Sequence, residues 1–68
     1  MTNKSPHLTN REKEVLVEIV KGSTSKEIAE ELEISTGTVE SHKRNIMLKY
    51  DVNNMVSLVV KAIKWGVV

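Results

Sequence analysis

Residues 24–39 read TSKEIAEELEISTGTV, and this stretch decides the fold. Its apolar residues have a spacing that predicts two helices joined by a tight corner. Ala29 lies where the two helices approach most closely, and apolar side chains on both sides hold the second helix at a steep angle to the first. Glu33 stands at the corner, where many such motifs have glycine. The spacing is that of a helix-turn-helix, with relative positions 0, 1, 4, 6 and 11 for Ile28, Ala29, Leu32, Ile34 and Val39.

The rest of the chain also has a helical pattern. Residues 9–12 and 24–27 each form a capping box, in which a threonine hydroxyl and a glutamate carboxylate satisfy free backbone N–H groups. No strand has a convincing signal. We therefore expect an all-α fold, a four-helix bundle containing a helix-turn-helix. The first helix ends at Gly22, the second near Leu32, the third covers 36–50, and the fourth runs from after Asn53 to Gly66.

Length and composition exclude several classes of protein. The 68 residues allow one small domain and exclude a two-lobed enzyme. Cysteine is absent and His7 and His42 are far apart, so we expect no metal and no cofactor. The longest run without charge, 52–60, is too short to cross a membrane, and we expect a cytoplasmic protein. Residues 1–7 are polar and are expected to form a disordered tail or a linker remnant, with the domain over 8–68.

Charge is unevenly distributed along the chain, although the net charge is only +1. Residues 11–34 hold four basic and seven acidic side chains, whereas residues 35–68 hold five basic and two acidic ones. Such a split favours an oriented encounter with a polyanion through the second half of the chain. The alternative interpretation is a solvated surface whose charges are segregated by chance.

Helical geometry separates a buried side from a free side of residues 36–50. At about 100° per residue, Val39, His42 and Ile46 cluster on one side of this helix. The opposite side is free to enter the major groove of double-stranded DNA. It carries three side chains suited to reading bases: Glu40, Ser41 and Arg44.

Each of these three side chains has its own chemistry toward a base pair. Arg44 can fork onto a guanine edge, and Ser41 can donate or accept a hydrogen bond. Glu40 can accept from a cytosine amine, but it also repels phosphate. The flanks of the helix carry residues suited to phosphate contact: Thr38, Lys43, Asn45 and Lys49. For the two lysines the alternative is ordinary charge exposed to solvent.

Ser41 and His42 do not form a catalytic pair. Adjacent residues on a helix point about 100° apart, and the sequence offers neither a third member nor an oxyanion pocket. We therefore expect no enzyme and no catalytic residue, and we interpret His42 as a packed structural side chain.

Five sequence elements resemble a known family. They are LTxRExEVL at 8–16, KEIAxxL at 26–32, IS at 34–35, TVxxH at 38–42 and NI at 45–46. Together they resemble the LuxR/GerE/NarL-type helix-turn-helix domain, over residues 8–68. The TVxxH element separates the chain from the similar region 4 of sigma factors.

The resemblance implies a place in a larger regulator. In that family the domain is the C-terminal output module of bacterial transcription regulators, including the response regulators of two-component systems. An N-terminal receiver or ligand-binding domain controls it, which implies that this chain is an excised domain or a stand-alone member. RNA polymerase is a further candidate partner.

The resemblance also implies roles for individual residues. It places Glu40, Ser41 and Arg44 at base-facing positions of the recognition helix. Family members often have lysine or arginine where this chain has Glu40. The resemblance therefore implies DNA binding but does not imply which DNA site this chain prefers. The resemblance places Ser25, Lys26, Thr38 and Lys49 near phosphates, whereas the phosphate roles of Lys43 and Asn45 are inferred from the residues alone.

The fourth predicted helix has more apolar surface than one buried face needs. From Met55 to Trp65 its only polar residues are Ser57, Lys61 and Lys64, which form one narrow stripe. The surplus either covers the domain's own core or meets a second copy, and in the resembled family this helix is the dimer contact. The candidate dimer contacts are Met55, Leu58, Val59 and Ala62, and the sequence does not divide them between core and interface.

The sequence therefore predicts sequence-specific binding of double-stranded DNA by a transcriptional regulator that forms a homodimer on its site. The rival from another class is a helical protein-interaction module that docks through the fourth helix. An RNA-binding role is poorly supported, because the chain has only two aromatic residues with which to stack on bases.

Overall fold

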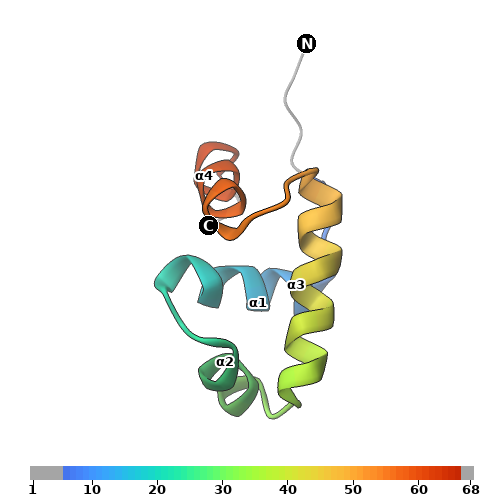
Figure 1. Ribbon diagram of the computed structural model, residues 1–68, viewed down its shortest axis with the longest axis vertical. Coiled ribbons are helices and arrows are strands. Elements are labelled where there is room, and N and C mark those ends of the chain that lie inside the picture. Colours follow the sequence, from blue (N-terminus) through green and yellow to red (C-terminus); the bar gives the residue numbers. More distant parts are fainter. Residues whose placement is uncertain (1–5, 67–68) are drawn as a thin grey trace.

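The computed structural model describes residues 6–66, and all of its regular structure is helical (Figure 1). The predicted all-α fold is therefore confirmed. Residues 1–5 of the predicted tail lie outside the described residues, and Pro6 and His7 precede the first helix. The helices are α1 (Asn10–Lys21), α2 (Ser25–Leu32), α3 (Thr36–Tyr50) and α4 (Met55–Lys64).

The helix ends follow the capping signals in the sequence. Thr9 and Thr24 each accept a hydrogen bond from the backbone N–H of the glutamate three residues later, and both capping boxes are complete. Gly22 ends α1 with a left-handed φ of 96°, as glycine permits at little cost. α4 ends at Lys64, two residues before the predicted end at Gly66, because the backbone turns at Trp65.

The predicted corner joins α2 to α3. Glu33 adopts the left-handed conformation there, with φ 59° and ψ 44°, although it has a side chain. The left-handed conformation costs a residue with a Cβ roughly 1–2 kcal/mol. The next amide, that of Ile34, donates to the carbonyl of Ala29 at 3.0 Å and ties the corner back onto α2. Ile28 and Val39, one from each helix, are fully buried beside it.

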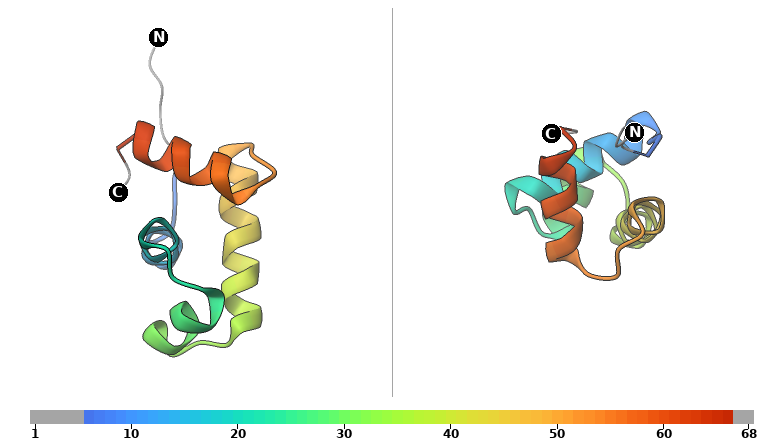
Figure 2. Two further views of the ribbon diagram at one scale, coloured as in Figure 1. Left: turned by 60° about the vertical axis from the view of Figure 1, so that its left-hand side comes forward. Right: turned by 90° about the horizontal axis from the view of Figure 1, so that it is seen from above.

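α3 is the helix around which the others are arranged. It packs against all three other helices. α2 and α4 lie at opposite ends of α3, and α1 passes between them (Figures 1 and 2). One side of α3 therefore forms the centre of the core while the other stays free along most of its length.

The position of α4 decides which of its residues reach the surface. Leu58 and Ala62 have no exposed surface and belong to the core, so their predicted role as dimer contacts is wrong: neither side chain can touch a second copy of this fold. Met55 and Val59 are partly buried and pack against the core. α4 is held to the end of α3 by Trp65, whose ring stacks on that of Tyr50 with centroids 5.5 Å apart.

Candidate nucleic-acid interface

The free side of α3 carries the polar residues that the sequence placed there. Val39, Ile46 and Tyr50 are buried against the other helices. Leu48 also lies on the free side and is 76% exposed. Four polar side chains on that side are exposed: Glu40, Ser41, Arg44 and Asn45.

Arg44 and Ser41 lie one helical turn apart on this free side. The Arg44 guanidinium nitrogen Nη2 is 3.4 Å from the Ser41 hydroxyl oxygen, a long contact between two exposed groups. Most of the five guanidinium donors of Arg44 therefore face solvent. A forked donor of this kind matches the O6 and N7 acceptors of guanine in the major groove.

The residues predicted to contact phosphate fall into two groups. Lys26, Thr38 and Asn45 are exposed, as phosphate contact requires. Thr38 lies in the first turn of α3, where its hydroxyl is 2.9 Å from that of the capping residue Ser35. The other three, Ser25, Lys43 and Lys49, are already engaged with acidic side chains of the domain itself.

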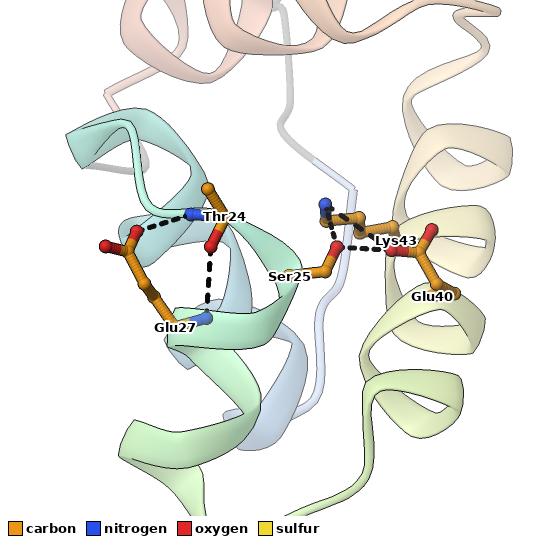
Figure 3. Close-up of polar contacts among 5 residues, drawn as sticks. All are labelled: Thr24, Ser25, Glu27, Glu40 and Lys43. Atoms are coloured by element: carbon orange, nitrogen blue, oxygen red, sulfur yellow. Dashed lines mark hydrogen bonds and ion pairs between the residues drawn. The ribbon is translucent and has the colours of Figure 1, made fainter.

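Ser25, Glu40 and Lys43 form one polar cluster between α2 and α3 (Figure 3). Lys43 Nζ donates to the Ser25 hydroxyl at 2.6 Å, and that hydroxyl donates to Glu40 Oε2. Lys43 Nζ also lies 3.7 Å from the same carboxylate oxygen. The Lys43 side chain is only 16% exposed, whereas that of Glu40 is 53% exposed. The structure thus brings together a predicted base contact and two predicted phosphate contacts.

Lys49 joins α3 to the start of α1. Its Nζ donates to Glu12 Oε1 at 2.7 Å, and the same oxygen accepts from the backbone N–H of Thr9. Glu12 is buried, with a side chain 7% exposed, although the sequence indicated only its part in the capping box at 9–12. A buried carboxylate needs such partners, and Lys49 therefore has a structural role that the sequence did not reveal.

The pKa of Glu12 records this environment. Burial by itself raises the pKa of the carboxyl. The hydrogen bonds from Lys49 and Thr9, together with the positive charge of Lys49, lower this pKa by more than burial raises it. The net pKa lies below the usual value of 4.5. Because the folded state lowers this pKa, ionised Glu12 contributes stability above pH 4.5, and that contribution is lost as the pH falls through the folded-state pKa.

Replacing Lys49 with methionine should lower the free energy of unfolding by about 1 kcal/mol at pH 7. The charged hydrogen bond is worth more when fully buried, but the Lys49 side chain is 36% exposed. The loss should shrink toward pH 3, because a protonated Glu12 no longer needs a cation. Urea denaturation at both pH values measures this, with Lys21→Met as control because Lys21 pairs with Glu18 on the surface. A loss of equal size at both pH values would contradict the pairing.

A second surface feature lies on α4. Three large apolar side chains are exposed on it: Val56 is 74% exposed, Val60 55% and Ile63 57%. They are spaced by four and three residues, so they form one stripe along the helix.

No helix within residues 6–66 has the length and apolar character needed to cross a membrane.

Comparison with known proteins identifies the family. The sequence pattern described as bacterial regulatory proteins, luxR family, matches residues 6–62, which is most of the chain. The chain belongs to the LuxR family of bacterial regulatory proteins. The predicted resemblance is thereby confirmed, as is the predicted class of a DNA-binding domain of transcription regulation rather than an enzyme.

Individual LuxR-family relatives resemble this chain over nearly all of its length. It is 50% identical over 60 residues to the uncharacterized response regulatory protein YgeK of Escherichia coli, and 47% identical over 62 residues to the transcriptional regulatory protein LiaR of Bacillus subtilis. It is 47% identical over 57 residues to the oxygen regulatory protein NreC of Staphylococcus haemolyticus. These matches cover 88%, 88% and 84% of this chain but only 41%, 29% and 26% of the relatives.

Three features of this LuxR-family domain were missed by sequence reasoning, and one of them is the polar cluster of Ser25, Glu40 and Lys43. The sequence shows Val56, Val60 and Ile63 at helical spacing, but the stripe through Leu58 and Ala62 is equally apolar. The sequence therefore does not tell which of the two stripes is exposed. The ionic contact of Lys49 joins residues 37 positions apart. No local pattern could have indicated that pairing.

Proposed function

We propose that this LuxR-family domain binds double-stranded DNA sequence-specifically, with α3 in the major groove, and acts as the output domain of a two-component response regulator. The observation that carries the proposal is the free side of α3. Glu40, Ser41 and Arg44 are exposed on this side, while the opposite side of the helix is buried and anchors it to the domain. Lys26, Thr38 and Asn45 are exposed beside it and are proposed to contact phosphates.

The response-regulator assignment rests on similarity. The relative from Escherichia coli is described as a response regulatory protein, and that from Bacillus subtilis as a transcriptional regulatory protein. On this proposal an N-terminal receiver or ligand-binding domain controls the DNA-binding domain, and RNA polymerase is its partner in transcription. A protein that acts on bacterial DNA in this way works in the cytoplasm.

A titration with DNA tests the proposal. A duplex is first selected from a random pool, and its binding is then followed by fluorescence anisotropy at several salt concentrations. We expect the logarithm of the binding constant to fall linearly with the logarithm of salt concentration, because each neutralised phosphate releases counterions. We also expect the selected duplex to bind more tightly than a scrambled one. Equal binding of the two duplexes would contradict sequence-specific recognition.

The exposed stripe on α4 favours a second candidate function, a helical protein-interaction module. Its apolar side chains are those on which another protein helix could dock. Such a module has no need of the polar free side of α3, and it would show no salt-dependent affinity for DNA. The titration above therefore distinguishes the two functions.

We further propose that the stripe of Val56, Val60 and Ile63 joins two copies of the domain on DNA. A two-fold contact must be self-complementary, so the same residues meet on both subunits. One helix from each chain buries little area, and the isolated dimer should be weak. DNA adds affinity because adjacent half-sites hold the two copies at a high effective concentration.

Replacing Val60 with glutamate should abolish cooperative binding to a paired site. The paired site is expected to be an inverted repeat with half-sites about one helical turn apart. Because Val60 is 55% exposed, the variant should remain folded, and its binding to a single half-site should stay close to wild type. Titration of one-site and two-site duplexes measures both quantities. Retained cooperativity in a folded variant would leave α4 as a structural helix only.

A further inference from the structure

The polar cluster of Ser25, Glu40 and Lys43 fixes the carboxylate of Glu40. Two groups converge on one carboxylate oxygen, Oε2. The Ser25 hydroxyl from the first turn of α2 donates a hydrogen bond to it, and the Lys43 ammonium group from the next turn of α3 lies 3.7 Å from it as an ion pair. Figure 3 shows the three side chains pointing toward one another across the space between the two helices. The glutamate is therefore held against the first turn of α2 and is not free to move over the surface of α3.

The other carboxylate oxygen is left for a ligand. Within residues 6–66, Glu40 Oε1 has no hydrogen-bond partner, and the side chain is 53% exposed on the free side of α3. An ionised carboxylate can only accept hydrogen bonds. The group that meets Oε1 must consequently be a donor.

The positive charge of Lys43 offsets the negative charge of Glu40 and so reduces the repulsion between this carboxylate and DNA. An isolated glutamate beside the groove would be repelled by phosphates on both strands. Here the Lys43 ammonium group lies 3.7 Å from the Glu40 carboxylate and balances its charge. The cluster can therefore enter the groove as a neutral unit.

We propose that Glu40 selects cytosine at one position of the DNA site and that Ser25 and Lys43 are its positioning residues. This inference rests on the proposed function. In the major groove only cytosine N4 and adenine N6 offer donors, whereas guanine and thymine present acceptors. Adenine also presents the N7 acceptor beside its donor, which repels a carboxylate. Cytosine is the base that the fixed Oε1 accepts from.

The experiment measures base preference with the whole 68-residue chain. A duplex is selected from a random pool, and every base pair of a half-site is then replaced in turn by the other three. The binding constants are measured for the wild type, Glu40→Gln and Glu30→Gln. Glu30 is the matched control, because it is exposed on α2 and lies outside the cluster.

The wild type should prefer cytosine at one position by about five-fold or more over each other base. Glu40→Gln should abolish the preference for cytosine and favour a base that presents an acceptor, because the amide keeps its oxygen toward Ser25 and Lys43 and turns its NH2 group, a donor, toward the base. Glu30→Gln should leave all preferences unchanged. Unchanged preferences in Glu40→Gln would overturn the inference. Failure of the wild type to select any duplex would instead overturn the proposed function.

Variants of the two positioning residues separate positioning from phosphate contact. Ser25→Ala and Lys43→Met should both weaken the preference for cytosine, and Ser25→Thr should restore it because it retains a hydroxyl. Circular dichroism checks that each variant is folded. A uniform loss of affinity on every duplex, with the salt slope reduced by about 1, would assign them to phosphates and overturn the positioning role. An unchanged cytosine preference in both variants would overturn it as well.

Discussion

Replacing Leu58 with alanine should lower the free energy of unfolding by about 2–5 kcal/mol. Leu58 has no exposed surface and is the largest side chain that α4 contributes to the fully buried core. Truncation removes its apolar contacts and leaves a cavity that the helix backbones cannot close completely. In a chain of 68 residues the margin of stability is thin, so much of the population should be unfolded.

Val60→Ala is the matched control for this prediction. It shortens an apolar residue on the same helix, but Val60 is 55% exposed and lines no part of the core. Urea denaturation followed by circular dichroism should show a small effect for Val60 and a large one for Leu58. Equal effects would mean that α4 is rotated about its axis.

Replacing Arg44 with alanine should weaken binding to the selected duplex by about 1–3 kcal/mol. The guanidinium is exposed on the free side of α3 and has only the long contact with Ser41 to hold it. The loss should be concentrated at one base pair, where the preference for guanine relaxes. Ser41→Ala should have a smaller effect, because one hydroxyl makes fewer directed bonds than a guanidinium fork.

Arg11→Ala provides the control for the loss of one positive charge. Arg11 lies on α1 and pairs with Glu14 at the surface, 3.1 Å away. Competition titrations with duplexes changed at single base pairs measure both affinity and selectivity. If Arg44→Ala binds like the Arg11 variant at every base pair, α3 does not read the groove through this residue.

The corner between α2 and α3 was predictable because its determinants are local. Ile28, Ala29 and Val39 lie within a dozen residues, and the capping box at 24–27 fixes where α2 begins. The fourth helix was predictable in extent but not in orientation. Both of its stripes are apolar, so only the packing against α1 and α3 decides that Leu58 faces inward and Val56 outward.

The free side of α3 was predictable for the same reason, since helical periodicity alone separates Arg44 from the buried Ile46. The partners of the charged residues were not. Lys49 meets Glu12 across 37 positions, and Lys43 meets Ser25 across 18. These pairs depend on how α3 lies against α1 and α2, which the composition of any one helix does not determine.

The stacking of Tyr50 on Trp65 gives the domain a built-in optical reporter. The chain has one tyrosine and one tryptophan, and they face each other between the end of α3 and the end of α4, with Lys61 Nζ 5.5 Å from the indole centroid. The intrinsic fluorescence of the protein therefore originates almost entirely at the α3–α4 junction. Detachment of α4 would change the emission of Trp65 while the far-ultraviolet signal of the remaining helices persisted. Peeling of one helix can thus be told apart from global melting without any label.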